Sequence, residues 1–265
     1  MREEIIEFIR MVKDDMGAKG GVVGLSGGVD SSVCMALFCE AMGPENCLGI
    51  IIPAWDSNPK DKSDAQQVAS CLGVRTVVHE MSLIDFKFPK HDFEKEVKPL
   101  LLSMDKLMPS EIELPYIMKL RGRMHIITYY AKLNNYLQCQ TLEKTEWMLG
   151  WFDKFGDGAG DIAPIRHLYK TQVYELAKRY IEKGMLPKLV IERKAGSGNY
   201  PLTDYEELGG MSFEDVDDIL DRLEVEHMTN RKAHLTSFSP NSVAKIEHLM
   251  QISEVKRRIP WVLGK

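Results

Sequence analysis

The sequence has few cysteines, and no two of them have redox or metal-binding spacing. The five are Cys34, Cys39, Cys47, Cys71 and Cys139, scattered through apolar segments without any C-x-x-C motif. This pattern indicates cysteines that pack in a core, as in proteins of the reducing cytoplasm. It also argues against sulfur-transferring enzymes, which commonly use cysteine pairs.

Long apolar runs and an excess of basic charge are absent too. No run approaches the roughly 18 apolar residues of a membrane-spanning helix, and the N-terminus, Met1-Arg2-Glu3-Glu4, does not resemble a signal peptide. The net charge of −5 disfavours a broad nucleic-acid surface. We therefore expect a cytoplasmic protein with neither a membrane nor a nucleic acid as its partner.

The residues that are present alternate between two kinds of segment. Helical spacing of apolar residues predicts helices over 2–16, 63–72 and 114–135, and further helices from 169, 212 and 239. Short apolar runs predict buried strands over 21–23, 47–52, 75–79 and 136–140, and residues 85–112 are expected to form a linker with one short helix. This order predicts an α/β fold with a doubly wound, mainly parallel sheet and flanking helices, whose ligands bind at the carboxyl ends of the strands.

The most informative stretch lies between the first predicted strand and the helix after it. It reads Gly24-Leu25-Ser26-Gly27-Gly28-Val29-Asp30-Ser31-Ser32. Adjacent glycines before a helix N-terminus let the backbone approach an anion, and the serines add hydroxyl donors. A carboxylate among phosphate donors repels the phosphate unless Mg²⁺ lies between them, which makes Asp30 a candidate magnesium ligand. At a loop edge, Asp30 is expected to contribute little to packing.

No lysine follows Gly28, where a Walker A loop has one, so γ-phosphoryl transfer is disfavoured. A glycine turn that binds nothing is the simpler alternative, but such a turn needs neither the serines nor Asp30. The motif resembles the pyrophosphate loop of the N-type ATP pyrophosphatases. That resemblance implies an adenine nucleotide alpha hydrolase-like fold, ATP binding by residues 24–32, and cleavage of ATP between its α- and β-phosphates.

A second informative region lies more than a hundred residues later. Residues 150–164 combine glycines, acids and the aromatics Trp151, Phe152 and Phe155, which is typical of an ordered functional loop. Lys170 then opens a predicted helix. The helix dipole disfavours a cation there, so its placement indicates a nearby anion.

Together these segments resemble the ammonia-dependent NAD synthetases. The resemblance rests on residues 24–31, on Arg121-Gly122-Arg123 through Tyr130, on residues 156–173, and on Thr203-Asp204 with Glu207-Leu208-Gly209. It implies that ATP adenylates the carboxylate of nicotinic acid adenine dinucleotide (deamido-NAD) and releases pyrophosphate. Ammonia then displaces AMP and NAD forms.

The same resemblance implies roles for single residues. Asp30 and Lys170 would be catalytic, Asp30 and Glu146 would hold Mg²⁺, and ATP would further contact Thr141, Lys170 and Ser197. Deamido-NAD would contact Arg121, Lys154, Asp161 and Lys256. A homodimer is implied, with one synthetase domain over residues 1–265. Because that length leaves no room for a glutaminase domain, ammonia would arrive free or from a separate amidotransferase.

Some positions depart from the family pattern. Where the family has Thr-Gly-Asn-x-Ser-Glu, this chain has Leu142 in place of the glycine and Glu143 in place of the asparagine. The serine of the segment around 194–199 is shifted to Ser197 or lost, and Val255 precedes Lys256 where the family has histidine. Two alternatives therefore stay open. One is a paralogous ligase for another carboxylate; the other is a non-catalytic adenine-nucleotide-binding protein, which would not need two metal carboxylates.

Overall fold

A four-stranded sheet forms the centre of the molecule. The computed structural model describes residues 1–54, 57–81, 113–192, 208–229 and 235–258. The strands are β1 (Gly20–Gly24), β2 (Cys47–Ile51), β3 (Arg75–Val78) and β4 (Tyr136–Gln138). They pair in the order β3-β2-β1-β4, and each pairing is parallel. The predicted parallel α/β sheet is confirmed.

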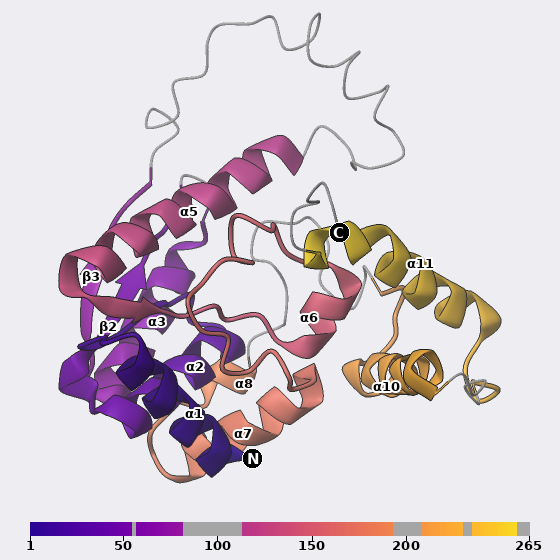
Figure 1. Ribbon diagram of the computed structural model, residues 1–265, viewed down its shortest axis with the longest axis horizontal. Helices are drawn as coiled ribbons and strands as arrows, with labels where there is room; N and C mark the ends of the chain where they lie inside the picture. The colour runs from indigo at the N-terminus through magenta and orange to yellow at the C-terminus, as the bar shows by residue number, and fades with distance from the viewer. Residues whose placement is uncertain (55–56, 82–112, 193–207, 230–234, 259–265) are drawn as a thin grey trace, which may run out of the picture.

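Helices cover both faces of this sheet (Figure 1). On one face, Val23 and Ile51 pack in a core with α1 (Arg2–Asp15), α2 (Val29–Met42), α3 (Pro59–Leu72), α7 (Lys170–Glu182) and α8 (Leu189–Glu192). On the other face, Val22 and Ile50 pack against α5 (Glu113–Asn134). Successive strand residues point to opposite faces, so neighbours such as Val22 and Val23 enter different cores. The doubly wound arrangement follows.

Close approach of α2 to the sheet depends on a glycine in β1. A Cβ built on Gly21 would lie 2.4 Å from two ring carbons of Phe38. Phe38 is fully buried in α2, and every residue of this helix from Ser31 to Cys39 is buried. The glycine therefore sets how closely the helix that follows the glycine-rich loop packs on the central strand.

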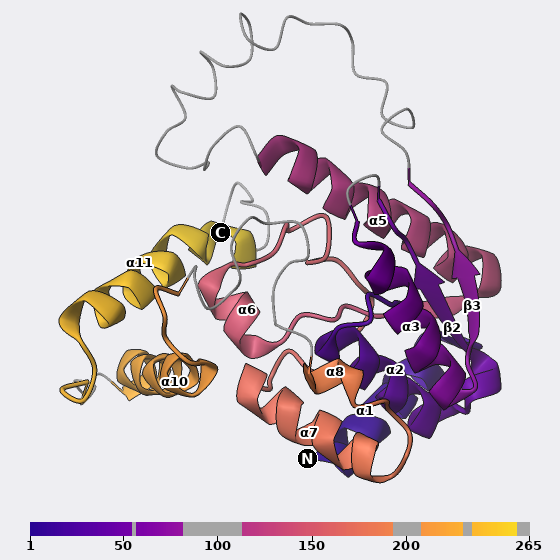
Figure 2. The same ribbon diagram turned by 180° about the vertical axis from the view of Figure 1, so that it is seen from behind.

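A second helical group lies at one end of the molecule, as Figures 1 and 2 both show. It consists of α6 (Lys144–Leu149), α10 (Phe213–Thr229) and α11 (Pro240–Arg257). These helices share a separate core that includes Leu149, Tyr169, Leu220 and Ile246. This group places the N-terminus of α6 beside that of α7.

Several predicted features fall outside the described residues: the linker over 85–112, the segment 194–199 with Ser197, and Thr203-Asp204 with Glu207. The short helix α6 and the single turn η1 (Pro44–Asn46) were not expected from the polar residues around them. Within the described ranges, no helix has the combination of length and apolar content that spanning a membrane requires.

Candidate functional site

The site lies beside β1, where the order in which the chain adds strands to the sheet reverses. From β1 the chain builds β2 and β3 on one side, and β4 then joins the other side of β1. The connections after β1 and β4 therefore meet at the carboxyl edge of the sheet, where doubly wound folds bind ligands. The first connection leads into α2 and the second into α6. A bridge between Cys139 and Ile162 brings the loop over 150–164 to the same edge.

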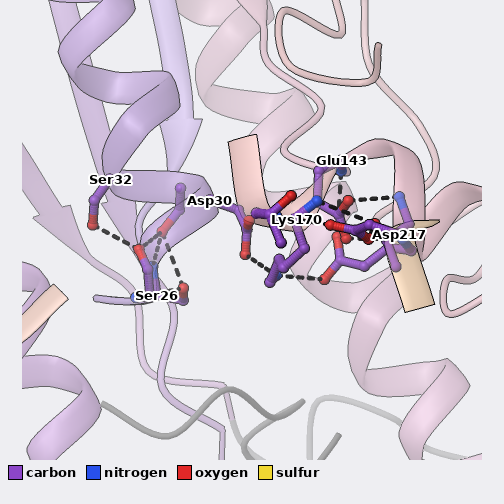
Figure 3. Close-up of polar contacts among 11 residues, drawn as sticks. Ser26, Asp30, Ser32, Glu143, Lys170 and Asp217 are labelled. Carbon is purple, nitrogen blue, oxygen red and sulfur yellow. Dashed lines mark hydrogen bonds and ion pairs between the residues drawn. The ribbon is translucent and has the colours of Figure 1, made fainter. Parts of the chain in front are cut away.

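The serines of the glycine-rich loop hold the loop itself in shape (Figure 3). The hydroxyls of Ser26 and Ser31 lie 3.0 Å apart, and the Gly28 N–H donates to Ser26 Oγ at 3.2 Å. Ser32 Oγ donates to the Gly28 carbonyl at 2.7 Å. The loop is therefore ordered before any ligand binds, which lowers the entropic cost of binding one.

Gly27 has a backbone conformation that this loop needs. Its φ is +80°, and a Cβ there would lie 2.8 Å from Asp64 Cβ and 2.9 Å from Ala65 N. Gly17 has a similar φ of +60° but nothing within 4 Å. Gly17 therefore experiences backbone strain alone on substitution, whereas Gly27 also experiences a clash.

We expect Gly27→Ala to lower the free energy of unfolding by about 1–3 kcal/mol more than Gly17→Ala, because only the former also overpacks its surroundings. Urea unfolding of the two variants measures the difference. Equal losses would mean that the loop shifts away from α3 and relieves the clash at no cost in the free energy of unfolding.

Three helix N-termini bring one lysine and two acids together. Lys170 Nζ lies 2.8 Å from Asp30 Oδ2 and 3.6 Å from Glu146 Oε1. Asp30 belongs to the first turn of α2, Glu146 to that of α6, and Lys170 is the first residue of α7. The Lys170 side chain is only 4% exposed. The protein itself therefore provides the anion that the position of Lys170 indicates, and Figure 3 shows the side chains of Asp30 and Lys170 pointing toward one another.

Burial and mutual charge decide the protonation of this cluster. Burial alone would lower the pKa of Lys170, but the carboxylates of Asp30, Glu146 and Glu143 outweigh it and hold that pKa well above its ordinary value. Burial raises the pKa of Glu143 to about 7, although the charge of Lys170 opposes the shift. Burial likewise raises the pKa of Glu146. Lys170 is therefore a permanent cation, and the acids around it together balance its positive charge.

Leu142 and Glu143, the two residues before Glu146 that differ from the family pattern, both have structural roles. Glu143 is the N-cap of α6, where its Oε1 accepts from the Glu146 N–H at 2.8 Å and its Oε2 from the Thr145 N–H at 2.6 Å. Carboxylates are favourable at this position because they satisfy free N–H groups and face the positive helix end. Leu142 is buried, so its bulk points into the core. This capping explains why the polar segment forms a helix.

The residues expected to contact deamido-NAD lie around the loop over 150–164. Arg121 makes a two-pronged ion pair with Asp153 at 2.9 and 3.0 Å, and both Arg121 and Lys154 lie beside the ring of Phe155. Lys154 donates to the carbonyl of Arg258, whereas Lys256 donates to those of Gly150 and Phe152.

Two further predicted contacts are Asp161, which lies within this loop, and Thr141, a predicted ATP contact that precedes the loop along the chain. Asp161 Oδ2 accepts from the Gln138 N–H at 2.9 Å, which ties the loop to β4. Thr141 is half-buried in the connection after β4. Substrate contacts of these residues therefore remain predictions, and Ser197 lies outside the described residues.

Sequence reasoning missed one residue of this region, Asp217 of α10. Its Oδ1 accepts from Thr145 Oγ1 at 2.5 Å and its Oδ2 from the Thr171 N–H at 2.9 Å. The available signal was its place on the apolar side of an amphipathic helix, beside Val216 and Leu220, where a buried acid is unusual.

Comparison with known proteins gives the family. The model of the NAD synthase family matches residues 1–260. The chain belongs to the NAD synthase family. Among its relatives, an NH(3)-dependent NAD(+) synthetase of Methanoregula boonei is 37% identical over 224 residues, covering 83% of this chain and 82% of that protein. One of Thermococcus kodakarensis, with the same description, is 34% identical over 264 residues, covering 97% and 94%.

Solved structures with related names have the same fold. An NMN synthetase from Francisella tularensis superposes with a TM-score of 0.76 at 24% identity, covering 100% of this chain and 97% of that one. An NH3-dependent NAD synthetase from Campylobacter jejuni, in complex with the nitrate ion, has a TM-score of 0.73 at 24% identity, covering 99% and 97%. At this identity the match concerns the fold, and it agrees with the predicted adenine nucleotide alpha hydrolase-like architecture.

Proposed function

We propose that this chain joins ammonia to the carboxylate of deamido-NAD at the expense of ATP, through an adenylated carboxylate, and releases NAD, AMP and pyrophosphate. Relatives described as NH(3)-dependent NAD(+) synthetases match most of its length. The observation that carries the proposal is the contact of Lys170 with Asp30 and Glu146 beside the pyrophosphate loop. A fixed cation at this position suits a reaction in which negative charge develops on departing pyrophosphate.

Each part of the site would perform one task on ATP. Residues 24–32, with Thr141 and Ser197, would hold the nucleotide, and Lys170 would face the phosphate oxygens. A carboxylate is a poor electrophile until one of its oxygens becomes a good leaving group, and transfer of AMP makes it one. Lys170 is charged and buried before ATP binds, so it would stabilise pyrophosphate without reorganisation during the reaction.

The acids of the site fit a magnesium ion. Asp30 Oδ1 is buried and has no hydrogen-bond partner, while Asp30 Oδ2 and Glu146 Oε1 both face Lys170. Mg²⁺ prefers carboxylate oxygens and completes its shell with water and phosphate. Among the described residues no group of three His, Cys, Asp or Glu could bind a metal, so Asp30 and Glu146 would hold Mg²⁺ together with ATP. Mg²⁺ would neutralise phosphate charge when bound.

The dinucleotide would bind along the loop over 150–164. Arg121, Lys154 and Lys256 provide positive charge for its phosphates, Asp161 a hydrogen-bond acceptor, and Phe155, which is 62% exposed, a ring for stacking. We further propose a homodimer. The outer side of α5 exposes Tyr129 and Leu133, two large apolar side chains one helical turn apart that a second copy would cover.

The setting of the reaction completes the proposal. Each of the five cysteines is free and four of them are buried, as in proteins of a reducing cytoplasm. Residues 1–265 would act as one synthetase domain. Ammonia would arrive from solution or from a separate amidotransferase.

Product analysis separates this function from its alternatives. With ATP, Mg²⁺, deamido-NAD and ammonium, we expect NAD, AMP and pyrophosphate in equal amounts, and no NAD when glutamine replaces ammonium. A ligase for another carboxylate would exchange labelled pyrophosphate into ATP without stimulation by deamido-NAD. A protein that only binds nucleotide would form no AMP under any of these conditions.

A further inference from the structure

Two buried side chains outside the predicted site connect the helices that carry Glu146 and Lys170. Thr145 is fully buried in the first turn of α6, next to Glu146, and its hydroxyl accepts from the Lys170 N–H at 3.1 Å. The same hydroxyl donates to Asp217 Oδ1 at 2.5 Å. The N-termini of α6 and α7 therefore meet at one hydroxyl group, and this hydroxyl donates its hydrogen bond to an acid of α10.

Asp217 also binds α7 directly. Its second oxygen accepts from the N–H of Thr171, the second residue of that helix. The N–H groups at the start of a helix have no partner within the helix. Asp217 accepts directly from the Thr171 N–H. The Lys170 N–H is satisfied by the Thr145 hydroxyl, which in turn donates to Asp217. It thus caps α7 from another helix, and Figure 3 shows it on the side of Lys170 away from the glycine-rich loop.

The charge of Asp217 also offsets an unfavourable charge at the start of α7. The first residue of this helix is a lysine, which the positive end of the helix disfavours. A carboxylate at the same end has the opposite, favourable interaction with the dipole and with Lys170. Because Asp217 is 95% hidden from solvent, this interaction is weakly screened.

The rest of α10 is anchored against the same helices. Val216, Ile219 and Leu220 are fully buried, and they share a core with Leu149 of α6 and with Tyr169 just before α7. The neighbouring acid, Asp218, instead pairs with Arg222 at the surface. One acid of the Asp217-Asp218 pair therefore faces the site, and the other serves as its natural control.

We infer that Asp217 is a positioning residue for the adenylation step: through Thr145 and Thr171 it fixes the starts of α6 and α7, and thereby the places of Glu146 and Lys170. The inference rests on the proposed function. Asp217 touches neither ATP nor substrate in this account. Its effect should therefore appear in the rate of the chemical step and not in the affinity for deamido-NAD.

The test compares Asp217→Asn with Asp218→Asn in the full chain, at a temperature where circular dichroism shows both to be folded. Asparagine removes the negative charge and presents an N–H to one of the two groups: the Thr171 N–H then loses its acceptor, or the Thr145 hydroxyl must accept where it donated to a carboxylate. We expect kcat to fall about 10–100-fold in Asp217→Asn, with KM for deamido-NAD within about twofold, and no change in Asp218→Asn. A kcat equal to that of Asp218→Asn, or a rise in KM alone, would overturn the inference.

A second pair of variants tests the connection itself and remains decisive if Asp217→Asn does not fold. Thr145→Ser keeps the hydroxyl and should retain most of the wild-type kcat, whereas Thr145→Val removes it and should lower kcat as Asp217→Asn does. Combining Thr145→Val with Asp217→Asn should add little to either loss, as expected of one chain of contacts. Equal rates in the serine and valine variants would refute the role. Absence of AMP from the wild-type protein would instead refute the proposed function.

Discussion

Lys170→Met should nearly abolish adenylation and also destabilise the fold. Removal of the cation leaves the carboxylates of Asp30, Glu146 and Glu143 together in a buried site. Breaking a buried charge pair typically costs about 3–5 kcal/mol, and loss of one fixed electrostatic partner of a transition state lowers kcat about 10²–10³-fold. Denaturant unfolding and the rate of pyrophosphate release measure the two effects.

Lys178→Met is the matched control on the same helix. Lys178 is half-exposed and pairs with Glu175 at 2.5 Å, a surface contact that water screens and that contributes little to stability. We expect its removal to change stability little and to leave the rate of pyrophosphate release as in the wild type. If Lys170→Met and Lys178→Met unfold alike, Lys170 is not part of a buried charge cluster.

Lys170→Met should recover stability as the pH falls. Burial raises the pKa of Glu143 to about 7 from an ordinary value of 4.5 even with Lys170 present, and loss of the lysine removes the charge that opposes this shift. Between pH 4.5 and the variant's own Glu143 pKa, which lies above 7, the folded variant then binds more protons than the unfolded chain does. Its free energy of unfolding therefore rises as the pH is lowered through that pKa, and the difference from the wild type narrows as the pH falls toward about 7. From about 7 toward 4.5 both proteins gain stability alike, and urea unfolding of the two at several pH values measures the change.

Asp30→Asn should stop pyrophosphate release while leaving the fold nearly intact. Asparagine keeps the shape of the side chain and an oxygen for Lys170, and Glu146 still faces the lysine. It removes the charge that would attract Mg²⁺ to the phosphates. We expect the rate to fall at least about 10²-fold, with the Mg²⁺ concentration for half-maximal rate shifted upward. Pyrophosphate release measured over a magnesium titration gives both values.

Asp30→Ala separates the two roles of this residue. The alanine leaves Lys170 buried with Glu146 3.6 Å away as its nearest acid, so the variant should be less stable than Asp30→Asn. This differs from the expectation that a loop-edge acid contributes little to packing. An Asp30→Asn protein with the wild-type rate and magnesium dependence would remove Asp30 from the reaction.

Local patterns in the sequence were sufficient for the fold and singled out Asp30 and Lys170 separately. The strand–loop–helix order around residues 20–42 predicted where β1 and α2 lie, because glycine pairs, apolar runs and capping residues act over a few positions. The resemblance to the NAD synthetases then joined these two residues in one hypothesis. Which anion Lys170 faces depends on a contact between residues 140 positions apart, which no local pattern encodes.

The roles of Glu143 and Asp217 could not be predicted for the same physical reason. Glu143 looked like an added charge in a nucleotide-binding segment, whereas in the structure it caps a helix that the polar residues around it did not suggest. Asp217 acquires its role because α10 packs against the starts of α6 and α7. Both are acids whose function comes from the backbone N–H groups they meet.

The most direct test of the account follows an oxygen atom. Deamido-NAD labelled with ¹⁸O in its nicotinate carboxylate is incubated with ATP, Mg²⁺, ammonium and the protein, and AMP is analysed by mass spectrometry. An adenylated carboxylate predicts that one ¹⁸O enters each AMP as NAD forms. Unlabelled AMP, or formation of NAD with ADP in place of AMP, would contradict the account.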